Sequence, residues 1–417
     1  MQLVAYGAQD IYLTGNPQIT FFKVVYRRHT NFAVESIEQT FNGLADFGKR
    51  VTATISRNGD LIQQMYLEVV LPIVGTADQM WTYGVGNALV KQAEIEIGGQ
   101  LIDRQYGDWM NIWTELTVPE GKRAGYDNMV GNKRPAATAI QTGQLDAEVI
   151  QRLYVPLQFW FNRNPGLALP LIALQYHEVK LNLELRNLSE LLNVGAATLT
   201  VNLGCKLYVD YIYLDTDERR RFAQVSHEYL IEQVQFTGSE SIAATEGAKN
   251  VTLNFNHPVK ELVWAHTDVL STTIGEGTGN RWFNYSGFTN AADVDSFTTA
   301  LLQLNGHDRF SVRFADYFRK VQNYEHHTRC PRVGKELDTD DARNQYIYSY
   351  SFALSPEEHQ PSGTCNFSRI DNAVLQLKYG ADTGFGAQTH GMNLNIYAVN
   401  YNVLRIMSGM GGLAYSN

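Results

Sequence analysis

Ile37-Glu38-Gln39-Thr40-Phe41-Asn42-Gly43 returns later in the chain as Ile231-Glu232-Gln233-Val234-Gln235-Phe236-Thr237-Gly238, with one residue inserted. Further matches follow in the same order, at offsets of roughly 190 to 210 residues, and together they indicate two copies of one domain. These matches pair Val51-Thr52 with Val251-Thr252, Ile97-Gly98-Gly99-Gln100 with Leu304-Asn305-Gly306-His307, Tyr106-Gly107-Asp108-Trp109 with Phe314-Ala315-Asp316-Tyr317, and Val179-Lys180-Leu181 with Ala373-Val374-Leu375.

Each copy is rich in strand signals. Apolar and polar side chains alternate, or form a short apolar run, in residues 63–71, 93–97, 180–185, 346–352 and 372–379. Helical signals are short and cover residues 108–116, 146–152 and 316–322. Since no strand–helix alternation supports a parallel sheet, we predict an all-β protein of two consecutive antiparallel jelly rolls, about eight strands each, with short helices in loops.

The same alternation predicts which side chains form the core. On the apolar face of the expected strands lie Leu67, Val69, Leu71, Phe159, Phe161, Tyr348, Tyr350 and Phe352. Turn chemistry recurs between the strands, at Asn58-Gly59, Gly98-Gly99, Asn164-Pro165-Gly166 and Asn305-Gly306.

Composition sets limits on function. The chain has 417 residues, of which 44% are hydrophobic, 12% aromatic and 18% charged, with a net charge of −9. This balance excludes a disordered polyelectrolyte and argues against a nucleic-acid-binding main surface. Neither a secretory signal peptide nor a membrane-spanning run is predicted. Without a secretion signal, Cys205, Cys330 and Cys365 are expected to be free thiols, with Cys205 and Cys365 buried in strands.

The repeat also predicts the domain organisation. We expect an N-terminal arm (1–30), a first jelly roll (31–215), a linker (216–226), a second jelly roll (227–405) and a C-terminal tail (406–417). The arm lies outside the duplicated unit and is dense in apolar side chains, so it should be held against something. Either it serves assembly beyond the domain, or it packs on its own first jelly roll as an added strand.

Motifs that carry chemistry are incomplete. The glycine-rich residues 275–279 and 409–412 do not join a strand to a helix, so they are interpreted as a flexible loop and tail. His326-His327 with Cys330 lacks a second ligand pair and is interpreted as a solvated loop, and Asp338-Thr339-Asp340-Asp341 lacks the glycine and distal glutamate of a calcium loop. The pairs His177-Glu178 and His227-Glu228 lack the second histidine of a zinc protease. We therefore predict no catalytic residue, no metal and no cofactor.

Four sequons could accept glycans if the chain met the glycosylation machinery. The candidates are Asn284, which lies in the most loop-like context, Asn250 and Asn187. Asn366 is the weakest of the four because it is expected to begin a core strand.

Several long runs resemble the major capsid proteins of nucleocytoplasmic large DNA viruses, most closely the algal-virus (phycodnavirus-like) branch. The resemblance covers essentially the whole chain. Its most specific segments are residues 4–23 (VAYGAQDIYLTGNPQITFFK), 56–60 (SRNGD), 165–179 (PGLALPLIALQYHEV), 361–372 (PSGTCNFSRIDN) and 402–415 (NVLRIMSGMGGLAY). The loops 117–145, 239–249, 267–293 and 323–343 look compact for the family, so glycan positions and host-facing features are not carried over.

The resemblance implies a structural protein of the virion, made in the host cytoplasm. Three copies of the double jelly roll would form a pseudo-hexameric capsomer of an icosahedral shell around double-stranded DNA. Partners would be neighbouring capsomers, and minor capsid proteins or an inner membrane layer at the arm, with no sequence-specific nucleic-acid binding. The alternative is a carbohydrate-binding or hydrolytic jelly roll, since the same fold hosts lectins and enzymes. A glycosidase would need two carboxylates in one cleft, and no pattern in the sequence indicates such a pair.

Overall fold

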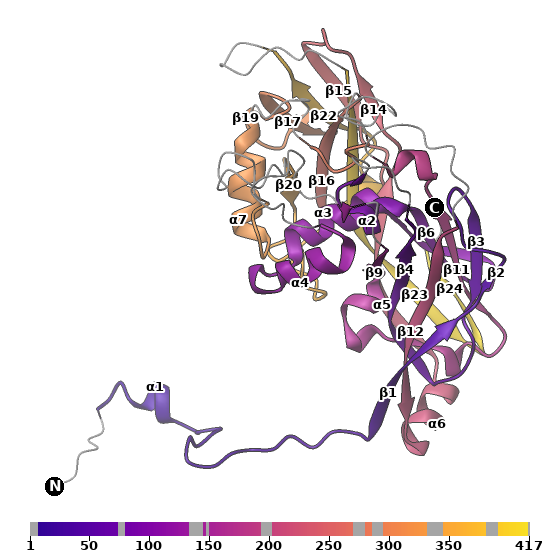
Figure 1. The fold of residues 1–417 in the computed structure, drawn as a ribbon. Helices are drawn as coiled ribbons and strands as arrows, with labels where there is room; N and C mark the ends of the chain where they lie inside the picture. The colour runs from indigo at the N-terminus through magenta and orange to yellow at the C-terminus, as the bar shows by residue number, and fades with distance from the viewer. Residues whose placement is uncertain are drawn as a thin grey trace.

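The computed structural model describes residues 7–73, 80–132, 145–146, 150–192, 202–269, 280–285, 295–331, 345–380 and 391–415. Figure 1 shows strand-rich halves built from the earlier and later parts of the chain, with the N-terminal segment leaving the body as an extended arm. No helix in these ranges is long and apolar enough to cross a membrane.

The first half is a pair of antiparallel sheets. One sheet has the order β1-β12-β4, with β9 and β10 both paired to β4. Its strands are β1 (Phe32–Gln39), β12 (Gly204–Leu214), β4 (Leu61–Leu71), β9 (Gln151–Pro156) and β10 (Leu169–Pro170). The facing sheet has the order β2-β3-β11-β6-β7. Its strands are β2 (Phe41–Asn42), β3 (Arg50–Thr54), β11 (Val179–Leu185), β6 (Val90–Ile97) and β7 (Gln100–Tyr106).

The second half repeats this arrangement. One sheet has the order β13-β23-β16-β20, with β14 and β24 paired to β23 and β21 to β16. Its strands are β13 (His227–Phe236), β23 (Met392–Met407), β16 (Pro258–Asp268), β20 (Tyr348–Ser351), β14 (Glu240–Ile242), β21 (Cys365–Asn366) and β24 (Met410–Leu413). The other has the order β15-β22-β17-β18, with β19 also on β17. Its strands are β15 (Ala248–Thr252), β22 (Ala373–Lys378), β17 (Thr299–Leu304), β18 (His307–Asp308) and β19 (Arg313–Phe314).

The duplicated segments of the sequence occupy equivalent strands, which confirms the predicted repeat. β1 corresponds to β13, β3 to β15, the β6–β7 hairpin to β17–β18, and β11 to β22, each in the same place of its sheet. Both hairpins turn through two residues of positive φ, which are Gly98 (58°) and Gly99 (81°) in one and Asn305 (51°) and Gly306 (78°) in the other. Such a turn matches the twist of its strands, so each pair fixes its hairpin register.

Short helices and strand pairs occupy the loops. The helices are α1 (Ile11–Thr14), α2 (Val85–Leu89), α3 (Gly107–Thr117), α4 (Glu120–Val130), α5 (Trp160–Arg163), α6 (Thr216–Gln224), a π-helix (Tyr317–Val321) and α7 (Gln322–His326), and the pair β5 (Met80–Trp81) and β8 (Leu145–Asp146) adds a small ribbon. The predicted helix is wrong for the described residues of 146–152, because Asp146 lies in β8 and β9 begins at Gln151 and pairs with β4, burying Leu153 and Val155. Tertiary pairing overrides a weak local signal here. Residues of the predicted linker form α6, whose cap Asp215 accepts a hydrogen bond from the Glu218 amide (3.0 Å).

The predicted core is largely confirmed. Six of the predicted core residues are fully buried: Leu67, Val69, Leu71, Phe159, Phe161 and Tyr348. Tyr350 and Phe352 are half-buried and pack against the core from its margin, so for these two residues the prediction is only partly confirmed. They lie where β20 leaves the sheet, and their rings contact Phe310 (5.0 Å) and Phe367 (6.0 Å) respectively.

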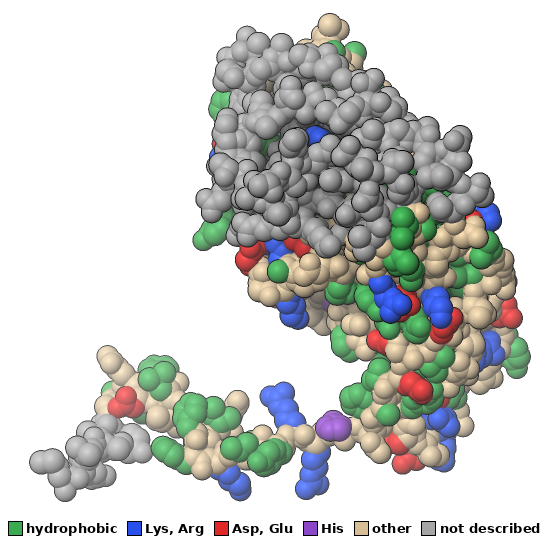
Figure 2. All heavy atoms as spheres, viewed as in Figure 1, with side chains coloured by type: hydrophobic (Ala, Val, Ile, Leu, Met, Phe, Trp, Pro, Cys, Tyr) green, Lys and Arg blue, Asp and Glu red, His purple; other side chains and the backbone are tan. Residues whose placement is uncertain are grey.

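The arm does not pack on its own jelly roll. Residues 7–31 are exposed apart from a half-buried Asp10, and the arm projects away from the body (Figures 1 and 2). Its exposed apolar side chains are Ile11, Tyr12, Leu13, Ile19, Phe21, Phe22, Val24, Val25 and Tyr26. The alternative of an added strand is therefore wrong for these residues.

Candidate assembly interfaces

The edge strands β7 and β13 meet where the two jelly rolls join. The Val234 amide donates a hydrogen bond to Asp103 Oδ1 (3.2 Å), and the Gln233 side chain donates to the Ile102 carbonyl. Burial raises the pKa of Asp103 to about 7, although Gln105 and Val234 donate to its carboxylate and act in the opposite direction. The repeated segment of the second jelly roll thus binds the first one directly.

An aromatic cluster continues this contact. The rings of Tyr106 on β7 and Phe236 on β13 lie 5.1 Å apart, edge to face. Tyr397 on β23 stacks on Phe236 at 4.8 Å and contacts Trp109 of α3 at 5.3 Å. Such pairs contribute beyond their buried area, so this cluster fixes the two halves together.

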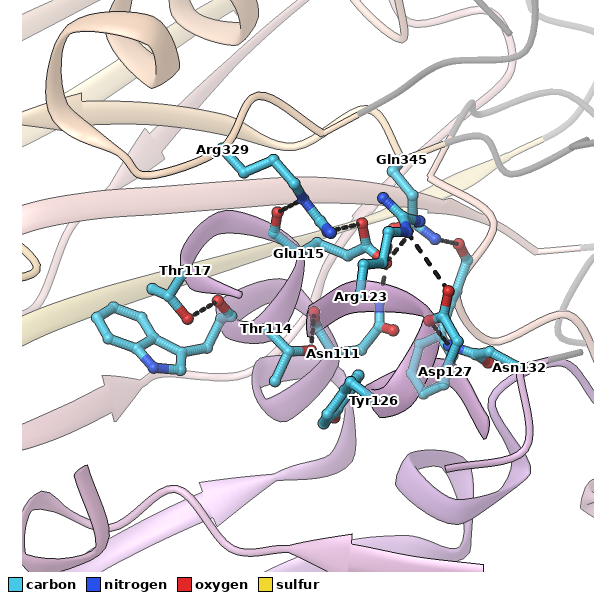
Figure 3. A network of polar contacts seen from close by, with 12 residues as sticks. Asn111, Thr114, Glu115, Thr117, Arg123, Tyr126, Asp127, Asn132, Arg329 and Gln345 are labelled. Atoms are coloured by element: carbon cyan, nitrogen blue, oxygen red, sulfur yellow. Dashed lines mark hydrogen bonds and ion pairs between the residues drawn. The ribbon is translucent and has the colours of Figure 1, made fainter. Parts of the chain in front are cut away.

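A buried polar network ties the second jelly roll to α3 and α4 of the first (Figure 3). Arg329 donates through Nε to the Glu115 carbonyl (2.8 Å) and pairs with the Glu115 carboxylate. Arg123 lies 3.4 Å from Glu115 and 3.4 Å from Asp127. Burial lowers the pKa of Arg329, and the charge of Glu115 opposes this shift. No pattern in the sequence singled out these residues, because the ion pairs join positions far apart along the chain.

A second buried ionic group crosses the same junction. Arg163 of α5 lies 3.2 Å from Glu232 of β13, and Lys260 of β16 lies 2.8 Å from the other carboxylate oxygen. Burial alone would raise the pKa of Glu232, but Arg163, His359 and Lys260 together lower it to about 2. Glu232 therefore stays ionised and holds the first jelly roll to the second through Arg163.

His327 corrects one prediction directly. Residues 326–330 were interpreted as a solvated loop, yet the His327 side chain is 0% exposed, 3.2 Å from Glu261 and 3.0 Å from Glu357. Burial would lower its pKa, but the two carboxylates outweigh that effect and raise it to about 9. His327 is an internal cation in the second jelly roll, with Glu261 as its buried partner.

Two grooves open along the junction of the jelly rolls. The larger, of about 380 Å³, is lined by β7, β13 and the C-terminal segment, with Asp103 in its wall. The other, of about 330 Å³, contains Asp108, Arg186 and Trp282, and the Arg186 guanidinium stacks 3.7 Å from the Trp282 ring centre. The residues that line each groove include one carboxylate. A glycoside hydrolase that works by acid and base catalysis uses two carboxyl groups that face each other across the cleft.

The sequons are dispersed over the surface. Asn187 is exposed at the start of a short 3₁₀-helix and contacts Glu190 (3.1 Å), and Asn250 is exposed on the edge strand β15. Asn366 is also exposed, whereas Asn284 is half-buried between buried Phe283 and Tyr285. Glycosylation at Asn284, Asn250 or Asn187 stays a prediction.

The cysteines are free thiols in separate places. Cys205 lies in β12 and Cys365 begins β21, which confirms their predicted strands. Both are half-buried, and burial raises the pKa of Cys205 to about 12. Cys330 is exposed.

The other motifs named in the sequence have structural roles where they fall in the described residues. Residues 409–412 form a turn and β24 on β23, so their interpretation as a flexible tail is wrong, and the Gly411 amide contacts the His177 ring (3.1 Å). His227 contacts the Phe222 carbonyl (2.9 Å). Residues 275–279 and 338–341 lie outside the described residues, as do parts of the loops 117–145, 267–293 and 323–343. Within the described ranges, no three metal-ligating side chains converge.

Comparison with known proteins places this geometry in context. Residues 20–215 match the family model "Major capsid protein N-terminus", and residues 218–412 match "Large eukaryotic DNA virus major capsid protein". The chain is 54% identical to the major capsid protein of Pyramimonas orientalis virus and 46% identical to that of Paramecium bursaria Chlorella virus 1, over 100% of this chain and 99% of each relative.

Solved structures show the same similarity. A quasi-atomic model of the PBCV-1 virus capsid superposes with a TM-score of 0.78 at 41% identity, over 95% of this chain and 100% of that one. The Faustovirus major capsid protein shares the fold, with a TM-score of 0.72 at 14% identity over 96% and 94% of the two chains.

Proposed function

Because this chain belongs to the major capsid protein family of large eukaryotic DNA viruses, we propose that three copies of it form one pseudo-hexameric capsomer of an icosahedral shell around double-stranded DNA. The chain is a structural capsid protein with a double jelly-roll fold. The proposal concerns how the copies assemble and what they contact.

The observation that carries the proposal is the equivalence of the two jelly rolls. β1-β12-β4 and β13-β23-β16 have the same order, and so do β3-β11-β6-β7 and β15-β22-β17-β18. Three such chains contain six similar wedges, and a heterologous interface whose rotation closes makes a cyclic ring. A ring of six similar wedges has the outline that tiles a flat hexagonal lattice.

The domain organisation supports the same assembly. We propose the arm 1–30, the jelly rolls 31–215 and 227–405, the linker 216–226 and the tail 406–417 as its units. Each main sheet uses strands from one half of the chain only, and α6 fills most of the linker. The tail adds to the second roll, because β23 extends to Met407 and β24 pairs with it. Each roll can thus keep its own sheets while the junction joins them.

The arm is proposed as the contact to the inner layer of the shell, through minor capsid proteins or an inner membrane. Its apolar side chains are exposed in the single chain; Phe22, for example, is 98% exposed. Exposed apolar surface of this kind marks an interaction site. Lys23, Arg27 and Arg28 follow it in the sequence and suit an acidic neighbour.

A catalytic role is not part of the proposal. The family consists of structural capsid proteins, and each junction groove has a single carboxylate in its lining. We place the mature protein in the virion and its synthesis in the host cytoplasm. The alternative, a carbohydrate-binding or hydrolytic jelly roll, would act as a monomer with affinity for sugars.

The mass and shape of the purified protein test the proposal. Light scattering should give about three times 47.0 kDa, and electron micrographs should show particles of pseudo-hexagonal outline. A stable monomer or dimer at micromolar concentration contradicts the trimer, and a monomer that binds oligosaccharides favours the alternative.

A further inference from the structure

We propose that the face of one copy formed by β19 and the π-helix docks on the β1–β2 edge of a second copy, with Phe314 contacting Phe41 of that copy. This inference rests on the proposed trimer and names the surfaces that would build it. A second copy of this chain is the only occupant proposed.

The sequence repeat makes two pairs of aromatic residues equivalent. Phe236 in the segment after Ile231 corresponds to Phe41 after Ile37, and Tyr106 before Gly107 corresponds to Phe314 before Ala315. Within the chain, Tyr106 and Phe236 meet edge to face at 5.1 Å across the junction of the jelly rolls. The equivalent partners of the other pair, Phe314 on β19 and Phe41 on β2, sit on the outer sides of their rolls, where Phe314 is exposed and Phe41 is half-buried against the core of its own roll.

These outer sides have apolar surface without a cover in the single chain. Phe314 and Val312 are each 59% exposed beside β19. The neighbouring Val321 and Tyr324 are 40% and 80% exposed. On the other side, β1 is an edge strand paired only with β12, and its Phe32 and Val34 are 54% and 52% exposed. A long exposed edge strand with apolar side chains is a template for docking.

Charge is complementary between the two faces. Arg309, Arg313 and Lys320 are exposed around Phe314, whereas Glu35 and Glu38 are exposed on β1. Glu38 pairs with Lys206 of β12 at 3.0 Å within the chain, at a site that is also open to solvent. In the internal junction, the residue equivalent to Glu38 is Glu232, which pairs with Arg163 of the other jelly roll at 3.2 Å. In the proposed interface, a cation of the docking copy would face Glu38 as Arg163 faces Glu232.

The positions of the two faces are compatible with a closed ring of copies. Figure 1 shows β19 and α7 on the left of the body and β1 at its lower right. Two different surfaces on opposite sides make a head-to-tail interface, and such an interface gives a closed ring when its rotation closes. With three chains, internal and intermolecular junctions would alternate around the ring.

Photo-crosslinking tests the contact itself. A benzophenone analogue of phenylalanine is placed at position 314 of isotopically light full-length chains, which are mixed with heavy chains, reassembled and irradiated. The expected product joins position 314 of a light chain to a heavy peptide from residues 32–42.

A substitution tests how much the contact contributes to assembly. Phe314→Asp should raise the protein concentration at which half of the chains are in trimers at least about tenfold, because a buried charge replaces a central aromatic side chain.

Tyr176→Asp is the matched control, since Tyr176 is an exposed aromatic residue outside both faces and outside the arm. It should leave the trimer unchanged, and both variants should keep the wild-type melting temperature of the monomer. A stable trimer with crosslinks from position 314 to other regions, or a Phe314→Asp trimer of unchanged affinity, overturns this inference but not the capsomer. A monomeric wild-type protein overturns both.

Discussion

His327 Nε2 lies 3.2 Å from Glu261 Oε2, and both side chains are 0% exposed. Because the pKa of His327 is raised to about 9 from 6.5, its protonated form stabilises the fold fully below pH 6.5, and this contribution is lost as the pH rises through 9. The loss should amount to about 3 kcal/mol.

Urea unfolding from pH 6.5 to pH 10 measures this effect. His327→Gln should flatten the fall in unfolding free energy with pH, whereas His307→Gln, at an exposed position of β18, should leave the slope as in the wild type. Equal slopes for His327→Gln and the wild type would show that the buried histidine is neutral.

Asp103 should give a second pH dependence, at lower pH. Burial raises its pKa from 3.8 to about 7, so the folded chain holds a proton that the unfolded chain has lost. Stability from this group therefore falls as the pH rises from about 4 through 7, by about 4 kcal/mol at most. Asp103→Asn should remove that fall, because the amide oxygen can still accept from the Val234 amide, and the amide nitrogen can donate to Gln105 Oε1 once the Gln105 side-chain amide turns over. A variant that keeps the wild-type pH profile between 4 and 8 would contradict the shifted pKa.

Removing Glu115 should destabilise the junction strongly. Glu115→Ala leaves Arg329 and Arg123 buried without their carboxylate, and breaking a buried ion pair typically costs about 3 to 5 kcal/mol. Glu228→Ala breaks an exposed pair with Arg405 and should cost about 1 kcal/mol or less. Thermal or chemical denaturation of both variants makes the comparison, and similar losses would mean that the Glu115 network is not desolvated.

Replacing an aromatic residue in the core should lower the free energy of unfolding more than replacing one at the margin of the core. Phe161→Ala removes a fully buried ring and should cost about 3 to 5 kcal/mol. Phe352→Ala removes a half-buried ring and should cost about half of that or less. Denaturant midpoints distinguish them, and an unmoved midpoint for Phe161→Ala would show that its face is wrongly assigned to the core.

Deleting residues 1–17 should separate assembly from folding. The described part of that segment makes no contact with the jelly rolls that would stabilise them, so the trimer should form with nearly unchanged melting temperature. Lattice assembly or binding of minor capsid proteins should fail, as seen by sedimentation and electron microscopy. Loss of soluble trimer would instead show that the arm belongs to the fold.

The strands and the duplication could be predicted because their signals are local. Alternation in residues 93–97 ends at Gly98-Gly99, and the structure has β6 and its turn there. The similar segments around Ile37 and Ile231 predict equivalent strands, which are β1 and β13 in the structure. Cys205 and Cys365 lie in strands for the same reason.

The interfaces could not be predicted because they depend on distant residues. Nothing near His327 in the sequence indicates that Glu261 and Glu357 will enclose it. Residues 146–152 look helical by composition, but Gln151 and Arg152 begin β9, whose pairing with β4 decides their structure. Tyr350 and Phe352 follow the right period, yet their burial depends on where the strand leaves the sheet.

The pairing of Arg329 with Glu115 also has a consequence for synthesis of the chain. The two residues are 214 positions apart, so Glu115 leaves the ribosome long before its partner exists. At roughly 5 to 20 residues per second, the interval is about 10 to 40 s. During that time α3 of the nascent first jelly roll carries a carboxylate whose cationic partner from the second roll has not been translated. The growing polypeptide should therefore be most dependent on chaperones in this window, and least once translation has passed residue 329.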